Sequence, residues 1–124
     1  MTTQQAFVAT LFDDRSNPGK VTVAVMMAMN AARKGHRATL VLMVEAVKLA
    51  VPGGVEGIDI GAPFKPVKEL LETFLSLGGK VVACASCLEH NHLTREQLDP
   101  RVGVVTAPEV IDLLMGAQGS LQVT

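Results

Sequence analysis

The hydrophobic residues of the chain fall into short apolar runs that are separated by longer amphipathic segments. The runs occupy residues 6–12, 37–43, 81–84 and 102–106, and a shorter one occupies 121–123. Near-continuous apolar runs of this length are typical of strands that are buried on both faces of a parallel sheet. The pattern therefore predicts four such strands and a short fifth.

Segments with helical spacing lie between the runs. Residues 20–34, 44–50, 67–77 and 109–115 are expected to be helices, and residues 86–98 are expected to be helical in part. Gly35 stands where the first helix ends and Pro108 stands in the first turn of the last one, positions that these residue types favour. Residues 55–66 are rich in glycine and proline, which predicts an irregular loop.

The alternation of strands and helices predicts one α/β domain over residues 1–124 with a mostly parallel sheet. Right-handed crossovers between parallel strands place helices on both faces, which gives a three-layer α/β/α sandwich. Ligands of open parallel sheets bind outside the carboxyl ends of the strands. Candidate functional residues are therefore sought in the segments 13–19, 44–66, 84–92 and 106–108.

Composition narrows the classes of function. The formal net charge is −1, and only 19% of the residues are charged, which argues against a nucleic-acid partner bound by bulk electrostatics. Aromatic residues make up 3% of the chain, too few for a base-stacking platform. No apolar run has the ~20 residues that span a bilayer, and residues 1–5 lack a signal-peptide pattern. We expect a soluble, cytoplasmic protein without a membrane or nucleic-acid partner.

The two cysteines are the strongest candidates for chemistry. Cys84-Ala85-Ser86-Cys87 lies where a buried strand ends and a helix begins. In a reducing cytosol a cysteine pair is more often reactive or metal-binding than a structural disulfide. A helix N-terminus favours a thiolate, and Cys87 is better placed than Cys84 to benefit. The alternative is a pair of inert, buried thiols.

Other polar residues are candidates for supporting roles. His90 and His92 follow the cysteines closely, so one imidazole is a candidate to stabilise a thiolate. At least one of the two histidines is expected to lie on the solvated surface. Cys84, Cys87, His90 and His92 are also a candidate set of metal ligands. The candidate is weak, because zinc sites usually combine two separated ligand pairs and these four residues lie in one short segment. Asp13 and Asn17 follow the first strand, where Asp13-Asp14 is expected to cap the loop or the next helix more often than to serve acid–base chemistry.

The order of these segments resembles the DsrE/DsrF-like family, whose better-known members are sulfur-relay proteins. The resemblance covers nearly the whole chain, and the cysteine turn is its most specific part. The remaining matching segments are Leu11-Phe12-Asp13-Asp14, residues 45–54, Gly78-Gly79-Lys80-Val81 and residues 106–114.

The resemblance implies a flavodoxin-like fold, assembly into homo-oligomers (trimers or hexamers) and no cofactor. Relay members use a cysteine at the position of Cys87 to accept sulfane sulfur as a persulfide, and a subset has a second cysteine at the position of Cys84. Many relatives also have an Arg-Gly pair a few positions further on, where this chain reads Leu88-Glu89-His90-Asn91-His92-Leu93. Arg95 is the nearest candidate to replace that arginine.

Three functional hypotheses follow from the sequence. The first is a persulfide carrier or sulfurtransferase-like enzyme that exchanges sulfur with a protein donor or acceptor. The second is a non-catalytic oligomeric binding module, which the apolar composition favours. The third is a thiol-redox or metal-binding protein that uses Cys84, Cys87 and a histidine.

Overall fold

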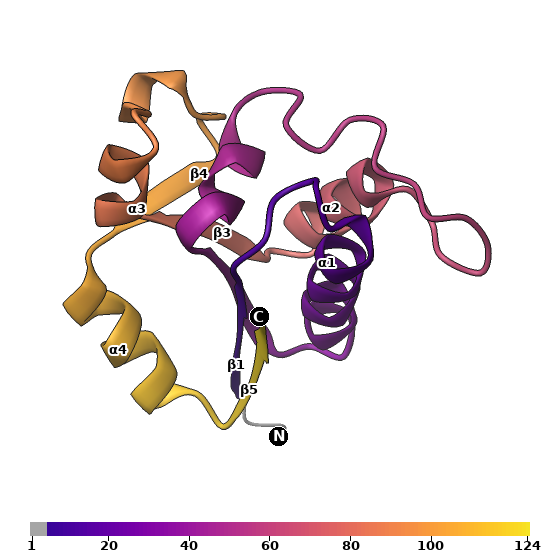
Figure 1. Cartoon of the computed structure of the whole chain (residues 1–124). Helices are drawn as coiled ribbons and strands as arrows, with labels where there is room; N and C mark the ends of the chain where they lie inside the picture. Colours follow the sequence, from indigo (N-terminus) through magenta and orange to yellow (C-terminus); the bar gives the residue numbers. More distant parts are fainter. Residues whose placement is uncertain (1–4) are drawn as a thin grey trace.

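The computed structural model describes residues 5–124 and contains one five-stranded sheet (Figure 1). Residues 1–4, on which the expectation about a signal peptide partly rests, lie outside the described residues. All strand pairs in the sheet are parallel and the strand order is β4-β3-β2-β1-β5. The strands are β1 (Ala6–Leu11), β2 (Arg37–Leu42), β3 (Lys80–Cys84), β4 (Val102–Val105) and β5 (Gly119–Val123).

The register brings the carboxyl ends of the strands to one edge of the sheet. Leu11 of β1 is paired with Leu42 of β2, and Cys84 of β3 is paired with Val105 of β4. The residues that follow each strand therefore meet at this edge, where the sequence pattern led us to look for a site.

One face of the sheet is covered by α1 (Pro18–Arg33) and α2 (Val67–Ser76), which pack against each other (Figure 1). Alanines on α1, among them Ala24 and Ala28, are fully buried and allow the helix to lie close to the strands. Phe74 of α2 is also fully buried in this core. Both helices thus bury their apolar faces in the core against the sheet, as their sequence patterns predict.

Among the described elements, α4 (Ala107–Gly116) alone covers the opposite face. Thr106 and Glu109 form a capping box, with Pro108 in the first turn as predicted. Only Val110 of this helix is buried, whereas Ile111 and Met115 are 57% and 82% exposed. This face is therefore much more thinly covered than the face of α1 and α2.

Short helices surround the carboxyl edge of the sheet. The 3₁₀ helix η1 (Val44–Ala50) follows β2 directly, α3 (Ala85–His90) follows β3 directly, and a 3₁₀ turn η2 (Arg95–Gln97) precedes β4. The helix α1 begins at Pro18 and not at residue 20, because proline is well suited to the first helical position. The helices and strands confirm the predicted α/β layers, and no helix within residues 5–124 is long and apolar enough to cross a membrane.

A buried hydroxyl in β1 gives a test of this packing. The Thr10 side chain is 2% exposed, and its Oγ1 has no hydrogen-bond partner within the described residues. A buried, unpaired hydroxyl is destabilising, so we expect Thr10→Val to raise the free energy of unfolding by about 1 kcal/mol. Thermal unfolding should show a rise in Tm of ~3–5 °C. A fall in Tm would mean that this hydroxyl makes a stabilising hydrogen bond.

Candidate functional site

The two thiols lie together at the junction of β3 and α3. Cys84 is both the last residue of β3 and the N-cap of α3, and it is 3% exposed. Cys87 lies one helical turn further on and is partly buried. Because residues three apart share a helix face, the two cysteines approach within 3.6 Å of each other, and both are free thiols.

A strained residue of η1 contacts the more exposed thiol. Val44 has a φ of 54°, in the left-handed region that a β-branched side chain rarely adopts. In this conformation the backbone N–H of Val44 donates a hydrogen bond to the sulfur of Cys87. Strain of this kind often occurs at functional sites. Here its consequence is a backbone donor that points at the candidate nucleophile.

Asn91 connects these two segments of the chain. Its Nδ2 donates to the carbonyl oxygen of Cys87 at 2.9 Å and to the carbonyl oxygen of Val44 at 3.3 Å. The side chain therefore joins the end of α3 to the start of η1, which are 47 residues apart in sequence. This bridge holds the Val44 peptide in place beside the thiol.

The pKa of the Cys87 thiol is raised, contrary to the expectation of a stabilised thiolate. Burial is the largest cause, because it disfavours the charged form, and the Cys84 thiol and the Glu45 carboxylate add to it. The Val44 N–H acts in the opposite direction.

A row of three charged side chains lies beside the thiols at the edge of the sheet. Lys48 Nζ is 2.6 Å from Glu45 Oε2 and 3.8 Å from Asp14 Oδ2, so it joins η1 to the loop after β1. The pKa of Asp14 is lowered, mainly because its carboxylate accepts hydrogen bonds from Ser16, and Lys48 adds to the effect. Lys48 therefore partly neutralises the Glu45 carboxylate that disfavours the Cys87 thiolate.

Asp13 and Asn17 stabilise the loop between β1 and α1. Asn17 Nδ2 donates to Asp13 Oδ2 at 2.9 Å, and Lys20 Nζ lies 3.3 Å from the same oxygen. Asp14 accepts from the backbone of Ser16 at 2.9 Å. The two carboxylates thus bind separate partners and cap the loop, which confirms the structural interpretation of this pair.

His90, His92 and Arg95 are exposed, and none of the contacts found in residues 5–124 joins them to a thiol. His92 has a φ of 58° and lies just beyond the end of α3, where the chain turns away from the helix. Within the same residues, no three His, Cys, Asp or Glu side chains are grouped closely enough to hold a metal ion. Cys84, Cys87, His90 and His92 therefore do not converge in this structure, because closeness in sequence does not bring side chains together.

Sequence reasoning missed four residues of the site: Val44, Glu45, Lys48 and Asn91. The segment 44–66 was identified as one that follows a strand, but no chemical role was assigned within it. An ion pair of Glu45 and Lys48 at a spacing of three residues is readable from the sequence. The positive φ of Val44 cannot be predicted from the sequence, because valine rarely adopts a left-handed backbone conformation.

A five-stranded parallel sheet with helices on both faces is the architecture of a flavodoxin-like α/β protein, and here a cysteine turn lies at the carboxyl edge of the sheet. The DsrE/DsrF-like family model matches residues 8–119, which is most of the chain. The chain belongs to the DsrE/DsrF-like family. No curated protein sequence gives a significant match.

Solved structures give the same fold. The ychN protein from E. coli is 16% identical, with a TM-score of 0.67, and the match covers 97% of this chain and 99% of that one. A conserved protein of unknown function from Bacteroides thetaiotaomicron is also 16% identical, with a TM-score of 0.66, and covers 96% and 95% of the two chains. At this identity the similarity establishes the fold alone.

The raised pKa of Cys87 predicts slow thiol chemistry at neutral pH. The rate of alkylation by iodoacetamide can be followed against pH by site-resolved mass spectrometry. The pH at which this rate is half its maximum should lie above ~8.5, the pKa of a free cysteine. Glu45→Gln removes a negative charge near the sulfur and should move this midpoint to lower pH. Glu69→Gln, on the exposed side of α2, is the matched control and should leave it unchanged. An unchanged midpoint in Glu45→Gln would contradict the assigned electrostatics.

Proposed function

We propose that this protein is a sulfur-relay protein that carries sulfane sulfur as a persulfide on Cys87. The groups that surround the Cys87 sulfur support this proposal most directly. A backbone N–H of a strained residue donates to it, and Cys84, a second free cysteine, comes within 3.6 Å of Cys87. Membership of the DsrE/DsrF-like family supports a role related to sulfur relay.

The loading step is an attack of the Cys87 thiolate on the outer sulfur of a donor persulfide. A bond forms between the Cys87 sulfur and the transferred sulfur, while the bond between the donor's two sulfur atoms breaks. The donor leaves as a thiolate, and the product is a persulfide on Cys87, so atoms and electrons balance. Because the resting thiol is largely protonated at neutral pH, the proton leaves to solvent or to the departing thiolate.

Partial burial of Cys87 suits a carrier more than a freely exposed catalyst. A partly buried adduct is shielded from unrelated thiols, and the Val44 N–H is placed to stabilise negative charge on the sulfur. Lys48, which pairs with Glu45 and Asp14, is a cation at the carboxyl edge that the thiols share. The proposed setting is the reducing cytoplasm, where both cysteines stay free.

Cys84 provides a route to unload the sulfur. Its thiolate attacks the Cys87 sulfur of the persulfide, the bond to the outer sulfur breaks, and hydrosulfide leaves as the Cys84–Cys87 disulfide forms. The outer sulfur is reduced by two electrons, and the two cysteine sulfurs are oxidised by the same number. The 3.6 Å approach of the two cysteines favours this step.

Mass spectrometry after incubation with inorganic polysulfide tests the proposal. We expect a gain of about 32 Da on Cys87, the mass of one sulfur atom in a persulfide. Cys87→Ser should abolish the gain. Cys84→Ser should keep it and prolong its lifetime, because the thiol that discharges the persulfide is then missing.

The same samples distinguish persulfide loading from simple thiol oxidation. A wild-type protein that only loses about 2 Da has formed a disulfide without loading, which is the outcome of the redox hypothesis. A gain that persists in Cys87→Ser would place the sulfur on Cys84 and would contradict the assignment of Cys87 as the carrier.

We also infer that copies of this chain associate through the face that α4 covers. Ile111 and Met115 expose large apolar side chains on this helix. Beside it lies a hollow of about 620 Å³, lined in part by Val82, Val105 and Leu113. Exposed apolar surface of this kind is typical of subunit contacts, and it supports the homo-oligomer expected for the chain.

Light scattering coupled to size-exclusion chromatography tests this association. We expect the wild type to have the mass of a trimer or hexamer. Met115→Glu should reduce the mass, because a carboxylate is costly to bury in an apolar contact. Ile60→Glu, at an exposed isoleucine in the loop before α2, is the control and should not. A monomeric wild type, or equal dissociation by both variants, would contradict the assigned interface.

A further inference from the structure

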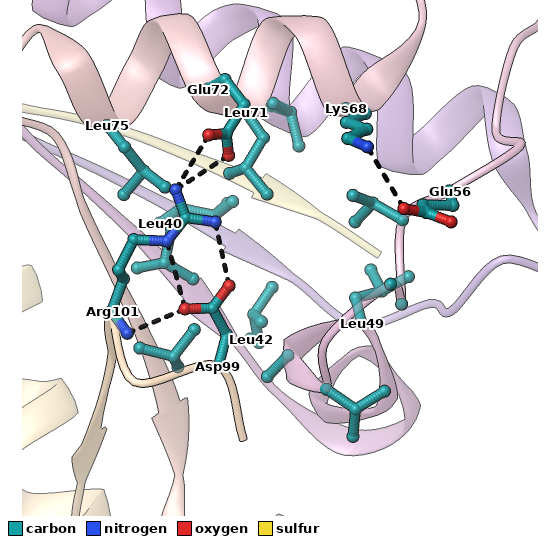
Figure 2. Close-up of a pocket in the computed structure, with 18 of the residues that line it drawn as sticks. Leu40, Leu42, Leu49, Glu56, Lys68, Leu71, Glu72, Leu75, Asp99 and Arg101 are labelled. Carbon is teal, nitrogen blue, oxygen red and sulfur yellow. Dashed lines mark hydrogen bonds and ion pairs between the residues drawn. The ribbon is translucent and has the colours of Figure 1, made fainter. Parts of the chain in front are cut away.

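A cavity lies between the sheet and α2, beside the C-terminal part of η1 (Figure 2). It has a volume of about 90 Å³. None of the residues proposed for the sulfur chemistry lines it. Its walls come from α1, η1 and α2, which lie over this part of the sheet. The segments 51–56 and 99–102 complete the lining.

The interior of the cavity is aliphatic. Its floor consists of sheet residues such as Leu40 and Leu42, and its walls include Leu49 of η1 and Leu71 and Leu75 of α2. No aromatic side chain lines it. Aliphatic walls of this kind favour apolar atoms over water, because water finds no hydrogen-bond partners among them.

A glycine loop forms one lip of the cavity. A Cβ on Gly54 would lie 2.6 Å from the carbonyl oxygen of Leu49, so this position has no room for a side chain. Gly53, with a φ of 77°, turns the backbone at the same lip. The loop backbone therefore lies directly against η1 at the entrance.

The rim also holds charged side chains that are paired with each other (Figure 2). Lys68 Nζ lies 3.2 Å from Glu56 Oε1, and Arg101 lies 2.9 Å from both Glu72 and Asp99. Three carboxylates and two cations alternate in sign around the rim, which leaves a net charge of only −1, and both cations are already paired with carboxylates. All but Asp99 are well exposed, and exposed pairs of this kind contribute only ~0–1 kcal/mol each.

We propose that this cavity binds a small, uncharged aliphatic molecule, or the uncharged aliphatic end of a longer one. The apolar walls and the mutually paired rim favour a neutral ligand over an acid or an amine. The volume is smaller than the ~150 Å³ of a cavity that holds benzene, which favours a short carbon chain over an aromatic ring. The site is separate from the thiols and does not depend on their proposed role.

Three probes with the same chain and different heads test the proposal: 1-pentanol, pentanoate and pentylammonium. Titration of ¹⁵N-labelled protein should shift the amide resonances of Gly53, Gly54 and Val102 with pentanol. At equal concentration the two charged probes should give shifts at least tenfold smaller. Equal or larger shifts with a charged probe would overturn the choice of a neutral ligand, and no shift with pentanol would overturn the site.

Matched variants locate the binding. Leu75→Phe fills the cavity from α2 and should remove the pentanol shifts. Leu77→Phe, the same substitution at an exposed residue that does not line this cavity, should keep them. If Leu75→Phe does not fold, Val102→Ile adds volume from the other wall and is measured in its place. Unchanged binding in the folded cavity-filling variant would overturn the proposal.

Discussion

The structure depends on the handedness of the connections between its parallel strands. A right-handed crossover that moves along the sheet in one direction places its helix on one face, and a crossover in the reverse direction places it on the other. The chain moves from β1 to β4 in one direction and then returns past β1 to β5. Within residues 5–124 this return connection alone covers the second face, and it supplies a single helix, α4. The thin cover of that face therefore follows from strand order.

The same constraint assembles the thiol site. Because all strands run parallel, the turns after β1, β2 and β3 meet at one edge, and each contributes one part. The turn after β3 supplies the thiols, the turn after β2 supplies the Val44 N–H, and the loop after β1 supplies Asp14. Asn91 and Lys48 then connect these turns by hydrogen bonds and ion pairs. No single segment contains the site.

The sequence was sufficient for the strands and for the position of the cysteine turn at the carboxyl edge of the sheet, because apolar runs and turn residues report burial and chain reversal directly. The capping box of Thr106 and Glu109 is equally local. Contacts between distant segments were not readable, which is why the bridge from Asn91 to Val44 was missed. The pKa of Cys87 was misjudged for a related reason. Its position at a helix start is a local property, whereas its burial and its distance from Glu45 depend on how η1 packs against α3.

The helix η1 is only seven residues long, yet it takes part in both sites. Its first residue donates to the Cys87 sulfur, and its sixth, Leu49, lines the aliphatic cavity. Substitutions at opposite ends of so short an element share a backbone, so their free energies are not expected to add. A change in thiol reactivity caused by a cavity variant would then be a coupling energy between two sites. A double-mutant cycle between residues 44 and 49 is the appropriate way to measure it.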